Sequence, residues 1–434
     1  MELNYLIALL SFVALLLLLT VGIPIAFAMA IIGFLSFWLL SGPNAALGML
    51  GIVPFASIAQ YTFTVMPMFV LMGELVFHAG FGKDVYWVAR QWLGRLPGGL
   101  AIATVFGCAI FGAASGSSIA ATVTVGKIAA PEMEKFGYNR RLAAGSICAG
   151  GPLDAMIPPS IVMVIYGVCT ETSIGKLLIA GFLPGFLAAF LMGLQVILRV
   201  WRNPSLGMPV RGVSWKDRIV SIKGVWGVAS AILGCIVTIY TGVCTPTEAG
   251  ALGAFTVFIV GLATKRLNPR AIWQSLLGAM RVIGMIFAIV MGAFIFNYQF
   301  AVSGLPYAAA AFIDQLRFSP MVILAAIFLL YIVLGCFLDT AAMLFLTLPV
   351  IFPITQKLGF DPIWFGILTV QLCEIGMITP PFGLTLFATK SVMPHVSTTD
   401  IAIGAFPFLL CHFINLILLT IFPQISLFLP SLMK

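Results

Sequence analysis

Four short polar segments interrupt the apolar stretches of this chain, at residues 112–118, 150–160, 335–340 and 374–381. They combine small residues with hydroxyl groups, and two of them contain adjacent prolines. A proline removes a backbone donor and frees the carbonyl oxygen one helical turn earlier. Carbonyl and hydroxyl oxygens are the ligands of hard cations, and a site with at most one carboxylate lacks the charge of a strong calcium cage. The segments therefore indicate sodium sites.

Three carboxyl groups, those of Asp154, Asp339 and Glu374, lie inside these apolar stretches. A charge at the centre of a membrane helix costs about 2.5–3.5 kcal/mol, so such residues are expected to have a function. Each could instead be a structural carboxylate with its own partners. The helices that begin after segments 112–118 and 335–340 point the positive ends of their dipoles into the same space, which suits an anionic group. Cation and anion sites are then expected side by side.

An internal repeat pairs these segments across the two halves of the chain. A shift of 222 residues places Pro24 on Pro246 and superimposes 117–118 on 339–340. The same shift relates Pro131 to Pro353, Lys135 to Lys357, Gly137 to Gly359, and Pro158-Pro159 to Pro380-Pro381. Serine and glycine in membrane helices more often pack than bind, but this match favours a binding role. A repeat whose prolines interrupt corresponding apolar segments is typical of a transporter with its site between the halves.

The composition places the chain in a membrane. Of its 434 residues, 61% are hydrophobic and 8% are charged, about a third of the charged fraction of a soluble domain. Apolar stretches of about 15–30 residues are long enough to cross the lipid core, so we expect membrane lipid around the chain. The net charge of +8 comes from basic residues in short loops. It indicates a positive-inside bias and no nucleic-acid partner.

The ends of the predicted spans carry less information. The opening stretch Leu3–Leu19 lacks the basic start and cleavage site of a signal peptide, so we expect it to be the first span. Four charged residues lie near span ends and could simply reach the interface: Glu74, Glu171, Glu248 and Lys390.

The charges of the loops give corresponding parts of the two halves opposite orientations. Loop 81–98 is basic and expected in the cytoplasm, whereas its repeat partner 303–320 carries one acidic and one basic residue. The basic loop 265–270 likewise has an uncharged partner at 42–48. Corresponding loops therefore face opposite sides, which requires an odd number of crossings in each repeat. The basic linker 199–223 is also expected in the cytoplasm, which places both termini outside.

We predict an all-α integral membrane protein of two inverted repeats, each with about five spans and one re-entrant helical hairpin. The first half has spans at about 3–21, 24–41, 49–79, 142–169 and 176–198, with a hairpin at 99–130. The second half has spans at about 224–242, 246–263, 272–301, 363–391 and 401–424, with a hairpin at 321–352. A hairpin stretch of about 30 residues is too short for two full crossings. Two short true spans are the alternative, and they leave the orientation unchanged.

The predicted domains follow from these spans. Residues 1–200 form the first repeat, with scaffold helices in 1–98 and a hairpin and broken helix in 99–198. Residues 201–223 form the basic linker. Residues 224–434 form the second repeat, with scaffold helices in 224–320 and a hairpin and broken helix in 321–424.

A series of motifs runs along the whole chain. These are Gly112–Ser118, Pro131–Met133, Ile157–Ser160, Tyr166–Gly167, Thr170–Gly175, Thr245–Gly250, Leu338–Thr340 and Ile378–Gly383. Together they resemble the large membrane subunit of tripartite ATP-independent periplasmic (TRAP) transporters. The resemblance implies sodium-driven import of an organic acid across the bacterial inner membrane, by a transport domain that moves against a scaffold like an elevator.

The resemblance also implies partners and a residue set for the site. The partners are a periplasmic substrate-binding protein and a small membrane subunit, which we expect to be a separate chain because this one begins at its first span. The co-transported sodium ions are expected at Ser115, Gly116, Ser117, Ser118, Gly150, Asp154, Pro158, Asp339, Thr340, Met377, Thr379 and Pro380. The organic acid is expected at Ser117, Ser118, Pro159, Thr340, Glu374 and Pro381.

Other classes of function fit the sequence less well. A serine hydrolase needs an activating base, and no histidine lies in the broken segments. Gly126-Lys127 and Gly175-Lys176 lack the other residues of a nucleotide-binding loop, so we predict no enzyme. The scattered histidines indicate no metal site other than sodium. An ion channel stays open as an alternative, as does a sodium/dicarboxylate symporter of similar architecture that works without a binding protein.

Overall fold

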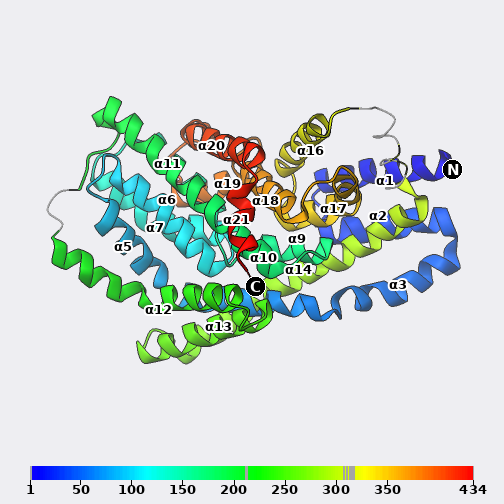
Figure 1. The fold of residues 1–434 in the computed structure, drawn as a ribbon, viewed down its shortest axis with the longest axis horizontal. Coiled ribbons are helices and arrows are strands. Elements are labelled where there is room, and N and C mark those ends of the chain that lie inside the picture. The colour runs from blue at the N-terminus through cyan, green and yellow to red at the C-terminus, as the bar shows by residue number, and fades with distance from the viewer. Residues whose placement is uncertain (1, 211–213, 306–307, 309–310, 312–317, 434) are drawn as a thin grey trace.

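The computed structural model describes residues 2–210, 214–305, 308, 311 and 318–433, and every regular element in them is a helix (Figure 1). Eight of these helices are long and apolar enough to cross a membrane. The prediction of an all-α integral membrane protein is confirmed. Arg211 of the linker, and Asp314 and Arg317 of the predicted loop 303–320, lie outside the described residues.

The first half begins with a series of apolar helices and continues through a hairpin to a broken helix. The early elements are α1 (Glu2–Thr20), α2 (Ile25–Ser41), α3 (Pro43–Ile58), the 3-10 turn η1 (Tyr61–Thr64), α4 (Val65–His78) and α5 (Phe81–Leu93). The hairpin is α6 (Gly99–Ser115) and α7 (Ser118–Lys135). The broken helix is α8 (Arg140–Gly150), η2 (Gly151–Ala155) and α9 (Ile161–Thr170), followed by α10 (Ile174–Ala180), α11 (Phe182–Arg202) and η3 (Pro204–Leu206).

The second half again has a hairpin followed by a broken helix. Its early elements are α12 (Trp215–Tyr240), α13 (Pro246–Ala263) and α14 (Pro269–Ser303). The hairpin is α16 (Pro320–Gly335) and α17 (Thr340–Lys357). The broken helix is α18 (Pro362–Ile378) and α19 (Leu384–Val392), followed by α20 (Thr398–Ile421) and α21 (Gln424–Ser431).

The third predicted span of the first half is not one helix. A continuous span over 49–79 is wrong, because the chain leaves the helix after α3 and Gln60 is extended (φ −93°, ψ 134°). The predicted loop 42–48 is also wrong. Only Gly42 interrupts the helices there, with φ of 85° in the left-handed region that favours glycine, and Pro43 starts α3 at once.

The predicted loop 81–98 contains a helix, α5. Its apolar residues recur at helical spacing, and Phe81, Val85 and Ala89 are buried against the protein. Asp84 on the same helix pairs with Arg266, which follows α13. Lys83 and Arg90, two of the basic residues that suggested a loop, therefore lie on an amphipathic helix, and Arg95 follows it.

The linker between the halves is shorter than predicted at both ends. α11 continues to Arg202, and α12 begins at Trp215, well before the expected residue 224. Ser214 and Asp217 form a capping box at that start, in which the Ser214 hydroxyl accepts from the Asp217 backbone N–H at 3.1 Å. A capping box satisfies the free donors of a first turn, so the helix starts within the basic segment.

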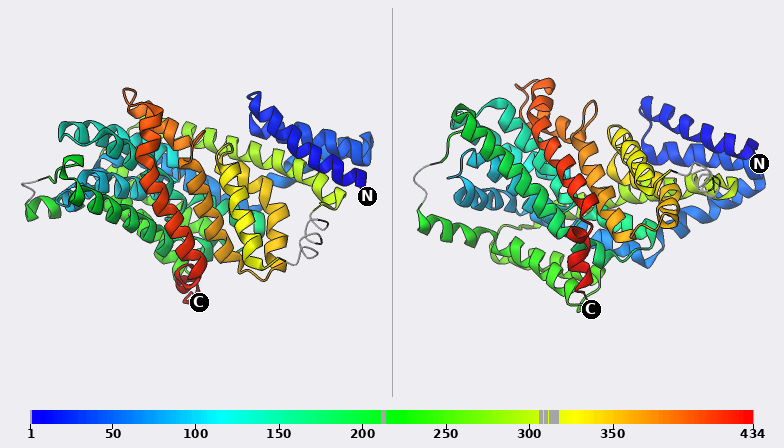
Figure 2. Two further views of the ribbon diagram at one scale, coloured as in Figure 1. Left: turned by 90° about the horizontal axis from the view of Figure 1, so that it is seen from above. Right: turned by 45° about the horizontal axis from the view of Figure 1, so that its top comes forward.

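The helices pack in two sets. One set comprises α1 to α4 with α12 to α14, in which α14 lies along α2 and α13 packs against α4. The other comprises the two hairpins, the two broken helices and the helices that follow them, with α8 packed against α20 and α16 against α18. Figures 1 and 2 show α1 to α3 at the opposite end of the molecule from α6 and α7. α5 contacts both sets, through α12 and α6.

Glycine lets the backbones of α2 and α14 touch. A Cβ atom on Gly33 would lie 2.5 Å from the Cα of Phe296, and one on Gly292 would overlap the carbonyl oxygen of Ala26. Small residues at helix contacts are the usual means of close packing in membranes, where burial of apolar surface adds little. The first set of helices is therefore tightly packed.

Candidate functional site

The first hairpin turns at Gly116 and Ser117. Gly116 has φ of 63°, in the region that favours glycine, and ends α6. The Ser117 hydroxyl accepts from the backbone N–H of Ala120 at 3.3 Å and so caps the start of α7. The turn itself therefore accounts for Gly116 and Ser117 at the tip. Polar groups at the tip could also bind a ligand.

The second hairpin has a similar cap at the equivalent position. The Asp339 carboxylate accepts from the backbone N–H of Ala341 at 3.2 Å, at the start of α17. The shift of 222 residues relates Asp339 to Ser117. Both tips therefore place an oxygen-bearing cap at the N-terminus of a helix, where the helix dipole is positive.

In each broken helix a side-chain hydroxyl donates to a backbone carbonyl oxygen at the break. In the first half, Asp154 lies in η2, and Ser160 caps α9 while donating to the carbonyl of Ala155 at 2.5 Å. In the second half, the Thr385 hydroxyl donates to the carbonyl of Met377 at 2.9 Å, where α18 ends. The peptide bond between the two prolines is cis in both breaks.

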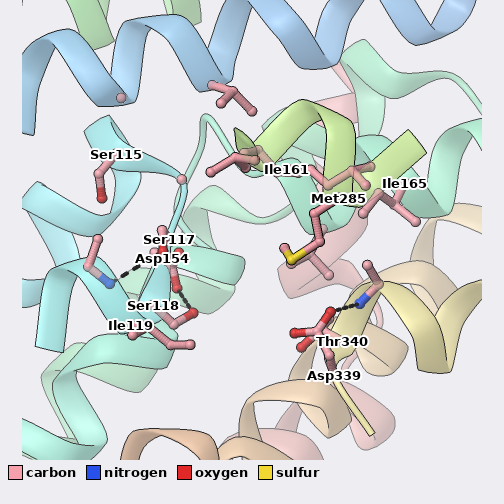
Figure 3. A pocket seen from close by; sticks show the side chains of 18 of the residues that line it. Ser115, Ser117, Ser118, Ile119, Asp154, Ile161, Ile165, Met285, Asp339 and Thr340 are labelled. Carbon is pink, nitrogen blue, oxygen red and sulfur yellow. Dashed lines mark hydrogen bonds between the residues drawn. The ribbon is translucent and has the colours of Figure 1, made fainter. Parts of the chain in front are cut away.

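The two tips line one cavity of about 310 Å³. Figure 3 shows Ser115, Ser117 and Ser118 on one side of it and Asp339 and Thr340 on the opposite side. The walls between them come from Ile161 and Ile165 on α9, from Val70, Gly73, Glu74 and Phe77 on α4, and from Val282, Met285 and Ile286 on α14. The cavity therefore lies at the contact between the two sets of helices.

A short hydrogen bond joins the first tip to the first broken helix. The Ser118 hydroxyl donates to Oδ1 of Asp154 at 2.5 Å. Asp154 is buried, and Gly112 on α6 packs against it, since a Cβ on Gly112 would lie 2.5 Å from the Cβ of Asp154. Hydrogen bonds to a buried carboxylate are short and strong, so the tip is held to the break.

The structure brings most of the predicted polar ligands together. Eight of the predicted residues line the cavity: Ser115, Gly116, Ser117, Ser118, Asp154, Asp339, Thr340 and Met377. Seven do not: Gly150, Pro158, Pro159, Glu374, Thr379, Pro380 and Pro381. Gly150 packs against Cys108 on α6 instead, and Pro380 and Pro381 are exposed.

Glu374 does not line the cavity. It is fully buried, and its carboxylate accepts from Gln371 at 3.0 Å and lies 3.3 Å from Nδ1 of His412 on α20. Gln371 in turn accepts from Asn415 at 2.5 Å. In this structure the side chain expected to bind substrate joins α18 to α20, and its Oε1 has no hydrogen-bond partner among the described residues.

The sequence reasoning missed the wall formed by α4 and α14. Glu74 is the one ionisable residue that this wall contributes among the described lining residues. The sequence analysis places it near a span end, where it could simply reach the interface. The available signal was a carboxylate within an apolar helix, the same signal that singled out Asp154 and Asp339. The described lining thus includes three carboxylates and neither lysine nor arginine.

Comparison of the sequence with models of protein families identifies the family of this chain. The model described as "Tripartite ATP-independent periplasmic transporter, DctM component" matches residues 12–425. The chain belongs to this family. As a DctM component it is a permease subunit of a secondary transporter for organic acids, and not an enzyme. It is a multi-pass protein of the bacterial inner membrane.

Individual relatives of this DctM component agree with the family match. The chain is 35% identical over 388 residues to the C4-dicarboxylate TRAP transporter large permease protein DctM of Pseudomonas aeruginosa, covering 88% of this chain and 89% of that protein. It is 30% identical over 381 residues to the sialic acid TRAP transporter permease protein SiaT of Haemophilus influenzae, covering 87% of this chain and 61% of that protein.

A solved structure has a similar fold. The Alcanivorax borkumensis YdaH transporter superimposes with a TM-score of 0.58 at 17% sequence identity, over 88% of this chain and 90% of that one. At this identity the likeness concerns the fold alone. It supports the all-helical fold of this chain.

Proposed function

We propose that this DctM component imports an organic acid together with sodium ions by an elevator-type movement. The observation that carries the proposal is that both hairpin tips line the same cavity. Ser117 and Asp339 cap the helices α7 and α17 that start there. One tip supplies hydroxyl groups and the other a carboxylate. The positive ends of α7 and α17 favour an anionic group in the same space.

The sodium sites are proposed at the two tips and the opposing helix breaks. On the first side the available oxygens are those of Ser115 to Ser118 and of Asp154, and on the second side those of Asp339, Thr340 and Met377. These sets combine one carboxylate with hydroxyl and carbonyl oxygens, which suits a monovalent hard cation. Sodium at each site offsets the charge of the carboxylate, so that an acid can bind between them.

The inverted repeats and the elevator movement are proposed from how the helices pack. α1 to α4 and α12 to α14 form the scaffold, and the hairpins with the broken helices form the transport domain. The hairpin tip and the scaffold touch at Gly73 on α4, where a Cβ atom would overlap the carbonyl oxygen of Ser115. Glycine at this position lets the backbone of α4 approach the tip closely.

The proposed movement needs energy and partners. A sodium ion that moves down a membrane potential of about 100 mV releases about 2.3 kcal/mol. We propose a periplasmic binding protein that delivers the acid and a small membrane subunit that holds the scaffold. The family match over 12–425 favours this tripartite arrangement over a symporter that works without a binding protein.

Uptake into proteoliposomes tests the proposed function. The chain is reconstituted with its binding protein and small subunit, and labelled organic acids are supplied under an imposed sodium gradient. We expect saturable uptake that needs both inward sodium and the binding protein. Uptake that is unchanged when potassium replaces sodium would contradict coupling, and uptake without the binding protein would favour the symporter.

A further inference from the structure

Glu74 brings a carboxylate to the cavity from the wall opposite the hairpins. It lies on α4, and its side chain is 23% exposed. Asp154 is held by Ser118 and Asp339 caps α17, so both of these carboxylates already have protein donors. Glu74 receives no such bond from the tips, and its partner, His78, lies on α4 itself. Its carboxylate therefore keeps acceptor capacity on the scaffold side of the cavity.

The position of the Glu74 carboxylate is fixed by its neighbours. Gly278 on α14 leaves room for it, because a Cβ atom at Gly278 would overlap Oε2 of Glu74. Ser275, one turn earlier on α14, donates to the carbonyl oxygen of Glu74 at 3.3 Å. α14 thus holds both the backbone and the side chain of Glu74 in place beside the cavity.

His78 pairs with this carboxylate within α4. Its Nε2 lies 3.4 Å from Oε2 of Glu74, one turn along the helix. A carboxylate has about four lone-pair sites, so acceptor capacity remains beside this contact. An acceptor beside an anion site favours an anion that also carries a hydrogen-bond donor.

We propose that Glu74 accepts a hydrogen bond from a hydroxyl or ammonium group of the transported acid. The substrate class is then a carboxylic acid that carries such a donor on its carbon skeleton, in preference to an acid of the same length without one. This inference rests on the proposed function, because it takes the cavity between the two tips as the place where the acid binds. It makes Glu74 a specificity-determining residue on the scaffold.

The expected preference follows from hydrogen-bond energies. A hydrogen bond to a charged group contributes about 1.5–3 kcal/mol, which corresponds to about 10-fold to 100-fold in affinity. Binding of any acid displaces water from the half-buried Glu74 carboxylate. An acid without the donor does not replace the hydrogen bond that this water made. The difference is therefore large enough to measure between acids that differ by one group.

Binding to the full chain, purified with any membrane partner that remains bound, tests the proposal. Stabilisation against heat in sodium is titrated with succinate, malate and aspartate, which share one skeleton, and with propionate, lactate and alanine. Each acid with a hydroxyl or ammonium group is expected to half-saturate at a concentration at least about tenfold lower than the matched acid without one. Equal half-saturation within both series would overturn the proposal.

Variants separate recognition from a structural role. Glu74→Ala is expected to bring the ratio of half-saturating concentrations close to one, since it removes the acceptor. A uniform loss of affinity for every acid, with the ratio unchanged, would overturn the proposal. Glu171→Ala serves as the matched control, because Glu171 is exposed and lines a different hollow, and its ratio is expected to stay as in the unaltered chain.

The same set of measurements separates this proposal from the coupling to sodium. If the binding preference is present but a sodium gradient drives no uptake, the proposed function fails and the role of Glu74 stands. If sodium drives uptake but the acids bind equally, the role of Glu74 fails and the proposed function stands.

Discussion

Ser118, at the start of α7, donates a 2.5 Å hydrogen bond to Asp154 in the broken helix η2. The bond joins two segments that lie 36 residues apart and that both line the cavity. A cation that uses the Asp154 carboxylate therefore binds to an oxygen whose position depends on the tip. Binding at the break and the conformation of the hairpin are thereby linked.

Removing the Ser118 hydroxyl is expected to weaken the sodium site proposed at the first tip. Ser118→Ala should raise the half-saturating sodium concentration of uptake by about 10-fold to 100-fold, because a hydrogen bond to a buried carboxylate contributes about 1.5–3 kcal/mol. Sodium titrations of uptake in proteoliposomes provide the measurement. Asp154→Asn should cause a similar shift.

Two further variants make this prediction specific. In Ser118→Ala/Asp154→Asn the effects should be less than additive, since both changes remove one interaction. Ser146→Ala is the control, because Ser146 is a buried serine of α8 whose hydroxyl donates to its own helix at Ala143. Additive effects, or an equal loss in the control, would count against the assignment.

Asp339 and Asp361 allow the charge at the second tip to be tested separately from helix capping. Both cap helices, α17 and α18, but only Asp339 lines the cavity. Asparagine caps a helix about as well as aspartate, so either substitution to Asn should preserve expression. A unit charge about 4 Å from a cation contributes about 1 kcal/mol even in water, or about fivefold in affinity.

The expected outcome differs between these two aspartates. Asp339→Asn should raise the half-saturating sodium concentration at least about fivefold, and Asp339→Ala should weaken sodium dependence further while assembly stays near normal. Asp361→Asn should leave it unchanged. An unaltered sodium titration in Asp339→Asn would refute a sodium ion at the second tip.

The sequence predicted the parts of this site that are marked by interrupted helices. Ser115 to Ser118 and Asp339 to Thr340 stand out because small and polar residues break apolar runs, and a repeat relates them. The same local signals predicted the hairpins to within a few residues, with α6 and α7 at 99–135 and α16 and α17 at 320–357. Turn chemistry is local, so it can be recognised without the fold.

The missed features depend on packing between distant segments. Glu74 joins the cavity only because α14 passes beside α4 at Gly278, and spacing along the chain does not show this. Glu374 has the same sequence signal as Asp154, yet Gln371 and His412 surround it. The predicted span 49–79 failed because Gln60 becomes extended in a run that is otherwise apolar.

Glu374 provides a test between a buried anchor and a substrate ligand. Glu374→Ala leaves Gln371 and His412 without their carboxyl partner, and a buried polar group left without its hydrogen-bond partner costs about 1–3 kcal/mol. We expect a lower melting temperature of the purified protein, measured by heating, and little folded protein in the membrane. Glu374→Gln retains an acceptor oxygen and should recover part of this loss.

The transport properties of Glu374→Gln distinguish the two roles. As a buried anchor, Glu374 should leave the apparent KM for the acid near its original value in the protein that folds. A KM raised tenfold or more, with normal heat stability, would instead place Glu374 in contact with substrate, as the sequence suggested.

Gly73 is where α4 touches the first hairpin tip, and it should tolerate no side chain. In Gly73→Ala the new Cβ would overlap the carbonyl oxygen of Ser115, which is backbone and cannot rotate away. The tip or α4 must then shift, and a displacement of about 1 Å at a binding site can cost about 100-fold in rate. We expect sodium-driven uptake to fall to near background, while the amount of protein in the membrane changes little because α4 keeps its other contacts.

Gly51→Ala on α3 is the control, since a Cβ there meets no atom within 4 Å. Normal uptake by Gly73→Ala would mean that this contact opens during transport at no cost, and would contradict a fixed scaffold wall at α4.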